Sequence, residues 1–478
     1  MKLRLEVVDG PEQGRQFELD GPASFLVGRS PHAHLRLDPA ADRYVSRTHF
    51  LIELRPPRCV VSDLDSANGT YVNDERITRR ELVDGDEIRA GRTRIRVGLV
   101  GMPARPSSSG ELPLPVEEAP AEPAPLLDGR PPKEFACCGC GRDLAVHAAA
   151  DGLARELADA LYLCRACAAK QQMPSLAGRR LGDFTLLQPH GRGGMGVVYK
   201  AVHELTRRIS AVKHLHPTAA EDERARKTFE REIDVQSAVV HPNLVRVLAR
   251  GEATGCFFVA FEFLPGGDLG RLVGKVVGGP LPPALACRYT LQILAGLEAL
   301  HAAGFVHRDL KPANVLLSRP WPDPAAVAKI TDYGLAKSYE DAGRSIFDYT
   351  RAGEAGGSLL FMPPEQVLNF RFVTPAADVY AVGVTLYYLL TAHYTVDYPM
   401  PGEPMRPGAR RRNPIELILE DPPVPVLWRT PDLPRGLAKV VDKAVQKDLD
   451  MRFATAAALR ESLAEVVRHE GLDVDGTA

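Results

Sequence analysis

Three glycines and a later group of charged and amide side chains form the part of this sequence best suited to chemistry. The glycines of the run HGRGGMGVV, at 191, 193 and 196, have the spacing G-x-G-x-x-G, which lets backbone amides approach phosphate groups closely. A lysine in AVK, the run HRDLKPAN and the triplet DYG follow. Carboxylate and amide oxygens are the hard ligands that magnesium prefers. The set therefore predicts binding of a phosphorylated ligand together with a divalent cation.

The order of these motifs is more informative than any one of them. The glycine pattern alone is a weak signal, because dinucleotide-binding folds use a similar string. Here Lys213, Glu232, HRDLKPAN and DYG follow in that order, and residues 181–468 resemble the eukaryotic-type protein kinases. The resemblance implies a bilobal α+β fold, with a sheet-rich lobe over 181–264, a helical lobe over 265–468 and a tail over 469–478. It also implies ATP and magnesium, or manganese in its place, as cofactors.

The resemblance assigns a role to each charged residue of the series. Lys213 is expected to bind the α and β phosphates of ATP, and Glu232 to hold this lysine by an ion pair. Asp309 is the expected base that accepts the proton of the substrate hydroxyl. Asn314 and Asp332 are the expected magnesium ligands.

The same resemblance indicates the substrate and the nucleotide site. Lys311 is typical of serine/threonine kinases, in which it steadies the γ-phosphate, so serine and threonine of protein substrates are the expected targets. Phe261 is expected to gate the adenine pocket beside a hinge over 262–264. The full expected nucleotide-binding set is Gly191, Gly193, Gly196, Val198, Ala211, Lys213, Phe261, Glu262 and Leu264.

Several positions differ from the usual kinase pattern. Tyr333 stands where phenylalanine is usual, which adds a hydroxyl that needs a partner if it is buried. His190 occupies a position that is usually aliphatic. These changes leave a second function open, a weakly active or inactive kinase-fold scaffold that binds phosphopeptides and nucleotide. Elsewhere the pattern holds: Glu365 could pair with Arg452, and Asp378 could anchor the catalytic loop.

A regulatory segment is expected between DYG and Glu365. Arg308, which precedes the catalytic aspartate, meets a phosphorylated activation loop in the family. Thr350 is the only threonine of the segment, and Ser345 lies close to it in sequence. We expect autophosphorylation at Thr350 or Ser345 to order the loop through Arg308.

Residues 1–100 carry a separate set of motifs. Apolar residues alternate with other residues over 3–7 and 95–99, which predicts strands with one buried face. The segments LVGRSPHAHLRL, YVSRTHFLIEL and DLDSANGTYVN resemble the forkhead-associated (FHA) domain, a phosphothreonine-binding β-sandwich. The expected partners are phosphothreonine-containing proteins or phosphothreonine on this chain itself.

The FHA resemblance also implies the binding residues. Arg29 and Ser46 are expected to contact the phosphate, Asn68 to hold the ligand backbone, and Thr48 to help line the site. His49 is expected to brace the loop that carries Ser46. An arginine fork suits a dianionic phosphate. The alternative is that these residues only form turns and cap a loop.

Two Cys-x-x-Cys pairs lie between these regions. Cys137 and Cys140 are separated from Cys164 and Cys167 by 23 residues. Four thiolates suit a structural zinc ion, and a segment of about 40 residues is too small for a core of its own. We predict a small zinc knuckle over 135–172, with Cys138 or His147 as spare ligands. A disulfide or unstructured thiols are the alternatives.

Composition limits the remaining classes of function. The 478 residues carry 59 basic and 61 acidic side chains, so no chain-wide field attracts nucleic acid or anionic lipid. Nine of the 40 prolines fall within 101–134, which predicts a flexible linker. The most apolar run, 379–390, is shorter than the roughly 20 residues that cross a bilayer. The chain is therefore expected to be a multidomain cytoplasmic protein without a membrane span.

Overall fold

The computed structural model describes residues 1–100, 178–333, 359–397 and 413–474, apart from gaps at 22, 38–41, 43, 57, 194–195, 216–232, 235, 254–255 and 369–372. The chain forms two compact units, the first containing 1–102, 221–247 and 264–478, and the second containing 103–220 and 248–263. The expected linker, the zinc segment with Cys137, Cys140, Cys164 and Cys167, and the residues Glu232, Ser345 and Thr350 lie outside the described residues.

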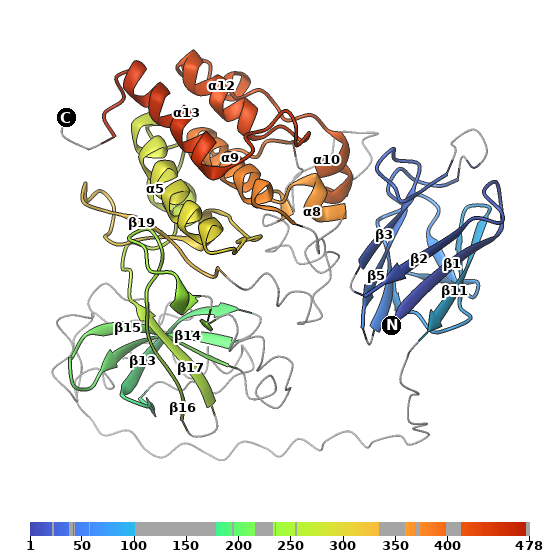
Figure 1. Ribbon diagram of the computed structural model, residues 1–478, viewed down its shortest axis with the longest axis horizontal. Coiled ribbons are helices and arrows are strands. Elements are labelled where there is room, and N and C mark those ends of the chain that lie inside the picture. The colour runs from blue at the N-terminus through green and yellow to red at the C-terminus, as the bar shows by residue number, and fades with distance from the viewer. Residues whose placement is uncertain are drawn as a thin grey trace, which may run out of the picture. The chain divides into compact units, whose positions relative to one another are not determined.

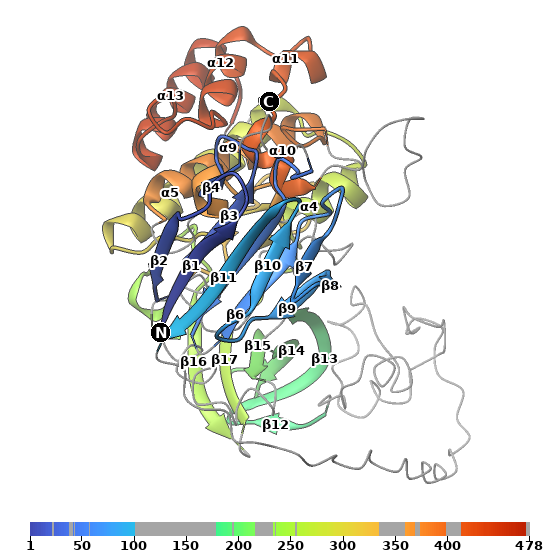
Figure 2. The same ribbon diagram turned by 90° about the vertical axis from the view of Figure 1, so that its right-hand side faces the viewer.

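The N-terminal part of the first unit consists of two β-sheets. One has the strand order β2-β1-β11-β10-β7-β8 and the other β4-β3-β5-β6-β9. Figure 2 shows the first sheet with its strands side by side. The strands are β1 (Lys2–Asp9), β2 (Gln16–Asp20), β3 (Ala23–Gly28), β4 (Leu35–Arg36), β5 (Phe50–Arg55), β6 (Arg58–Asp63), β7 (Thr70–Val72), β8 (Glu75–Ile77), β9 (Arg79–Glu81), β10 (Glu87–Ala90) and β11 (Thr93–Val100).

The predicted alternation places the core between these sheets. Leu5 of β1 pairs with Val97 of β11, and both are at most 1% exposed. Phe25 of β3 and Phe50 of β5 belong to the same apolar cluster. Glycines at 10, 69 and 85 have φ values of 111°, 80° and 87°, a region that favours glycine and allows tight turns between strands. The β-sandwich expected over 1–100 is therefore present.

The second unit contains a single described sheet, with strand order β12-β13-β14-β15-β17-β16. Its strands are β12 (Arg180–Leu181), β13 (Phe184–Gly193), β14 (Gly196–His203), β15 (Ile209–Leu215), β16 (Val247–Ala253) and β17 (Cys256–Glu262). The core residues Leu186, Tyr199, Val212 and Phe258 come from four of these strands. This sheet corresponds to the sheet-rich lobe expected over 181–264.

The rest of the first unit is mainly helical, as Figure 1 shows for α5, α9, α12 and α13. The elements are α4 (Leu269–Arg271), a π-helix (Leu272–Val277), α5 (Pro283–Ala302), a 3₁₀ turn (Pro312–Asn314), β18 (Val315–Leu317), β19 (Ala328–Ile330), α8 (Pro364–Leu368), α9 (Pro375–Thr391), α10 (Pro414–Glu420), α11 (Val426–Arg429), α12 (Arg435–Ala444) and α13 (Ala456–His469). Proline lies at the first positions of α5 and α9, where its missing N–H has no intrahelical partner to lose.

Helices α5 and α9 form the centre of this helical part. Leu294 and Leu297 of α5 and Val382 and Leu386 of α9 are fully buried in one cluster. Gly383 allows close packing, because a Cβ there would lie 2.7 Å from the Cβ of Ala444 in α12. Among the described residues, no helix is both long enough and apolar enough to cross a membrane.

Candidate active site and phosphate-recognition loop

A buried carboxylate in α9 holds the backbone of the HRD segment. Asp378 is 1% exposed and accepts hydrogen bonds from the amides of His307 at 2.7 Å and Arg308 at 2.8 Å. His301 Nε2 lies 2.8 Å from the same carboxylate. Arg308 has a φ of 65°, and the two amide bonds stabilise this conformation, which is rare for a side chain of its size. The expected anchoring of the catalytic loop by Asp378 is thus present. It positions Asp309, which directly follows Arg308.

Asp309 is surrounded by donors from its own loop. Lys311 Nζ lies 2.9 Å and 3.1 Å from its two carboxylate oxygens. Asn314 Nδ2 donates to the Asp309 carbonyl oxygen at 2.7 Å and to its carboxylate at 3.0 Å. The side chains of Asp309 and Lys311 are 13% and 17% exposed, so the carboxylate is shielded but accessible. Three of the predicted catalytic residues therefore meet at one point.

The segment that carries Asp332 is tied to this loop. The Thr331 amide donates to the Asn314 carbonyl oxygen at 2.9 Å, and His307 Nε2 lies 3.1 Å from the Thr331 carbonyl oxygen. Asp332 follows with a φ of 57°. Within the described residues, no cluster of three or more His, Cys, Asp or Glu side chains could hold a metal ion by itself. The expected magnesium ligands, one amide and one carboxylate, suit a cation that also binds phosphate oxygens.

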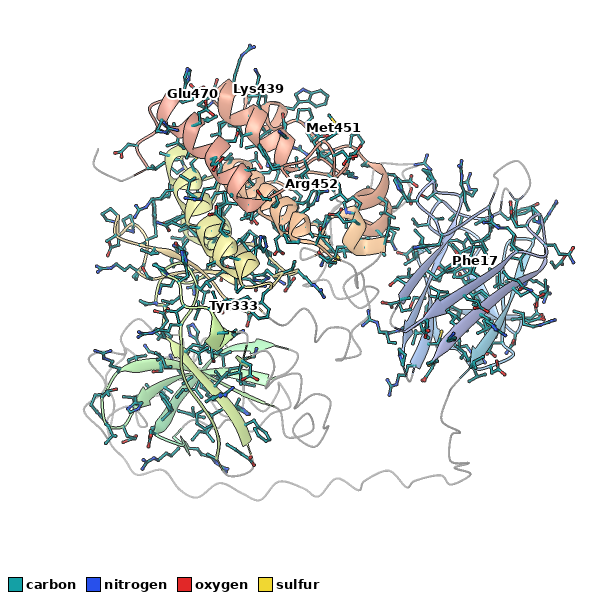
Figure 3. The ribbon with its side chains drawn as sticks, in the orientation of Figure 1. Phe17, Tyr333, Lys439, Met451, Arg452 and Glu470 are labelled. Atoms are coloured by element: carbon teal, nitrogen blue, oxygen red, sulfur yellow. The ribbon has the colours of Figure 1, made fainter. Side chains whose placement is uncertain are left out.

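Tyr333, labelled in Figure 3, is 1% exposed in the apolar cluster of the helical part. Its hydroxyl donates to the Val245 carbonyl oxygen at 2.9 Å and lies 3.4 Å from that of Gln236. Gln236 Nε2 donates in return to the Tyr333 carbonyl oxygen at 2.9 Å. The tyrosine is accordingly accommodated without an unsatisfied hydroxyl.

Lys213 lies on β15, an interior strand of the second unit's sheet, and is 8% exposed. It is opposite Val198 of β14 on one side and Val259 of β17 on the other. Ala211 of the same strand is opposite Phe261. The fold thus gathers several expected nucleotide-binding residues on three neighbouring strands. The His190 ring contacts Phe263 at a centroid distance of 5.2 Å, so this unusual histidine packs against an aromatic ring.

An ion pair links α8 to the loop before α13. Arg452, labelled in Figure 3, has a fully buried side chain and donates to Glu365 Oε1 at 2.8 Å. It also donates to the carbonyl oxygens of Ala376, Gln446 and Lys447 at 2.8 to 3.2 Å. The expected pairing is therefore present, and the backbone bonds satisfy the remaining donors of the guanidinium.

The FHA signature residues lie in neighbouring loops of the sandwich. The Arg29 amide donates to the Ser46 carbonyl oxygen at 3.0 Å. A Cβ at Gly28 would lie 1.9 Å from the Arg47 carbonyl oxygen, so only glycine fits there. His49 Nδ1 accepts from the Ser46 amide at 2.9 Å, and His49 Nε2 lies 3.2 Å from the Gly69 carbonyl oxygen. The bracing expected of His49 is observed.

The surroundings of the other FHA residues were not predicted from the sequence. The Ala67 amide donates to Ser46 Oγ at 3.0 Å, and Asn68 Nδ2 donates to the Tyr44 carbonyl oxygen at 2.7 Å. Thr48 is 1% exposed, and among the described residues its hydroxyl has no hydrogen-bond partner. Arg29 lines a cavity of about 440 Å³ together with Ser30, Pro31, His32, Arg47, Glu420 and Asp421.

Sequence reasoning missed several residues that shape these sites. Gln366 Nε2 donates to the Arg308 carbonyl oxygen at 2.6 Å and so ties α8 to the catalytic loop. Asp42 is fully buried and accepts from the Arg92 amide at 2.7 Å. Asp63 accepts from the hydroxyl of Thr70 at 2.6 Å. Only the order D-x-x-x-x-N-G-T hinted at the last of these, since Asp63 and Thr70 flank the Asn68-Gly69 turn.

Two family models match parts of this chain. Residues 184–463 match the family model of the protein kinase domain, and residues 25–91 match that of the FHA domain. The kinase match covers more than half of the chain, so the chain belongs to the protein kinase family.

Bacterial serine/threonine-protein kinases are among its relatives. Serine/threonine-protein kinase PknD of Mycobacterium tuberculosis is 32% identical over 282 residues, 59% of this chain and 39% of that protein. Serine/threonine-protein kinase pkn2 of Myxococcus xanthus is 32% identical over 286 residues, 59% of this chain and 32% of that protein. The matches thus span less than half of these relatives. The solved PknI kinase domain of Mycobacterium tuberculosis is 24% identical with a TM-score of 0.44, covering 60% of this chain and 98% of that one.

Proposed function

We propose that this chain is a serine/threonine protein kinase that transfers the γ-phosphate of ATP to hydroxyl groups of proteins. The observation that carries the proposal is the arrangement around Asp309, whose carboxylate is oriented by Lys311 and Asn314 on a loop held by Asp378. A positioned carboxylate beside a lysine is what phosphoryl transfer to an alcohol requires.

In this proposal each residue has a defined task. Asp309 orients the substrate hydroxyl and accepts its proton while the new bond between oxygen and phosphorus forms and the bond to the β-phosphate oxygen breaks. Lys311 offsets negative charge beside the transferred group. Lys213 holds the α and β phosphates. Bound magnesium would neutralise phosphate charge, with the amide oxygen of Asn314 and the Asp332 carboxylate as its protein ligands.

Radiolabelled ATP with magnesium and a generic protein substrate tests this activity. Asp309→Asn should reduce phosphate transfer by about 100-fold or more, because general base catalysis and orientation are lost together. The matched control is Asp432→Asn, which changes an exposed aspartate of the helical part. Equal, very low transfer by wild type and Asp309→Asn would instead favour the scaffold function.

We further propose that the FHA module binds phosphothreonine through Arg29 and Ser46, with Asn68 and Thr48 as supporting residues. Arg29 supports this, because among the described residues its buried Nε has no hydrogen-bond partner and its side chain lines an open cavity. Arg29→Ala should abolish binding of a phosphothreonine peptide to the full chain, measured by fluorescence anisotropy. Arg36→Ala, at an exposed position of β4, is the control. Unchanged binding by Arg29→Ala would contradict the assignment.

Two proposals concern residues outside the described part of the chain. Cys137, Cys140, Cys164 and Cys167 are proposed to hold one structural zinc ion, which elemental analysis of the purified chain would detect at one equivalent.

Thr350 or Ser345 is proposed as the autophosphorylation site that engages Arg308. Mass spectrometry after incubation with ATP would locate the phosphate, and a fully active double alanine variant would contradict this role.

A further inference from the structure

One sheet of the FHA module has two apolar faces. In β3, Phe25 and Val27 belong to the core between the sheets, so Leu26 points to the opposite face. In β5, Leu51 alternates in the same way between Phe50 and Ile52. Leu26 and Leu51 are nevertheless only 1% and 3% exposed. The sandwich alone does not bury this second face.

The second face is buried against the helical part of the same unit. Leu26, Leu51 and Leu64 form one apolar cluster with residues before and within α8, with one residue after α9 and with residues of α10. These residues are Leu359, Leu360, Met362, Val367, Val396, Ile415, Leu417, Ile418 and Leu419. All members of this cluster are at most 9% exposed. We call the face formed by Leu26, Leu51 and Leu64 the docking face.

Charged groups beside the docking face are complementary. Residues 44–49, directly before β5, are called the recognition loop. Its Arg47, between Ser46 and Thr48, lies 2.8 Å from the Glu420 carboxylate and 3.9 Å from that of Glu416. The side chains of Glu416 and Glu420 are only 11% and 12% exposed. Among the described residues, Glu420 Oε1 is buried without a hydrogen-bond partner. The acidic residues of α10 thus lie beside a loop that is proposed to bind a phosphate.

The cavity lined by Arg29 brings these groups together. It is bounded by Arg29 and Arg47 from the FHA module and by Glu420 and Asp421 from the end of α10. A phosphate bound at Arg29 would meet these carboxylates, and like charges in a partly buried site repel strongly. Ligand binding and this packing therefore oppose each other.

We infer that the docking face binds the kinase part of the same chain, and that a phosphothreonine ligand competes with the acidic end of α10 for the recognition loop. The inference rests on the proposed phosphothreonine binding. It also connects the FHA module with catalysis, because Gln366 of α8 bonds the carbonyl of Arg308, directly before Asp309. Phosphothreonine binding releases the surface formed by 359–367 and 415–419.

The first test uses the full chain and a phosphothreonine peptide. The double variant Glu416→Gln and Glu420→Gln should bind the peptide at least fivefold more tightly than wild type, because the competing charges are gone. The control, Glu461→Gln with Glu465→Gln, changes an exposed pair with the same spacing on α13 and should leave affinity unchanged. Equal affinities in all three proteins would overturn the competition. Absence of binding in all three would overturn the phosphothreonine function instead.

Hydrogen exchange tests the docking itself, whether or not a peptide binds. Leu51→Asp places a charge on the docking face and should accelerate exchange at 359–367 and 415–419, while saturating peptide should do the same in wild type. The double glutamine variant, which leaves the sandwich untouched, should shift exchange in the same direction if Leu51→Asp fails to fold. Unchanged exchange in the folded variants would overturn the docking. Exchange that depends on protein concentration would show a second copy as the occupant and overturn the intramolecular form.

Discussion

The hydroxyl of Tyr333 donates a hydrogen bond to the Val245 carbonyl oxygen over a distance of 2.9 Å. This bond extends a series of contacts in which the Val245 amide donates to Ile330 and Asn243 Nδ2 donates to Ala328. Tyr333, which replaces the usual phenylalanine, thus adds a hydrogen bond to the segment that contains Val245. It fastens the side chain of Tyr333, the residue after Asp332.

Replacing Tyr333 by phenylalanine should remove this connection while preserving the ring. We expect a loss of about 1 to 2 kcal/mol in the free energy of unfolding, because the Val245 carbonyl loses its donor in a buried site. Urea denaturation measures the change, with Tyr71→Phe in the FHA module as the control. Adding Gln236→Leu gives a double-mutant cycle, and strictly additive effects would show that the two side chains do not cooperate.

Removing the cation of the buried Arg452–Glu365 pair should be severely destabilising. Arg452→Met leaves Glu365 without its counter-ion and is expected to cost about 3 to 5 kcal/mol. Arg460→Met is the comparison, because its pair with Glu298 has side chains 44% and 27% exposed and should contribute at most about 1 kcal/mol. Thermal unfolding of both variants distinguishes them. Similar losses in both would mean that burial does not govern the contribution of the Arg452 pair.

Asp378 should affect catalysis without touching substrate. Asp378→Asn places an amide where two backbone N–H groups now meet a carboxylate, so the HRD segment should shift. We expect kcat to fall by about 100-fold, because a displacement of a catalytic group by about 1 Å can lower the rate by that factor. The KM for ATP should change much less. Steady-state kinetics provides the readout. An unchanged kcat would refute the positioning role.

His34 should make the FHA module sensitive to mild acid. Its Nδ1 accepts from the Leu26 amide at 3.0 Å, and burial lowers the pKa of its imidazole below the ordinary 6.5. The neutral form is favoured in the fold, so the stabilisation is complete above pH 6.5 and declines as the pH falls through that value toward the lower pKa. Melting temperatures of wild type and His34→Asn should converge between pH 7.5 and 5. A constant difference would contradict this.

The local elements follow closely from the sequence. The helices Pro283–Ala302 and Pro375–Thr391 lie within the helical lobe expected over 265–468, because proline starts them and their apolar residues pack into one core. The strands at 2–9 and 93–100 follow from strict alternation. The contacts of Asp378 and the Glu365–Arg452 pair were also predicted, since they belong to the kinase resemblance. Gln236, Arg47 and Glu420 were not, because each looks like an ordinary polar surface residue in the chain.

The sequence by itself determined which chemical groups this protein carries and in which order, since phosphoryl transfer and phosphate binding each need particular residue types at characteristic spacings. Only the tertiary structure decided what each group meets. Gln236 and Tyr333 are 97 residues apart and Arg47 and Glu420 are 373 apart, so no local pattern relates them. Packing of the apolar faces brings such pairs together. The low dielectric of the protein interior then strengthens each polar interaction and raises the cost of losing a partner.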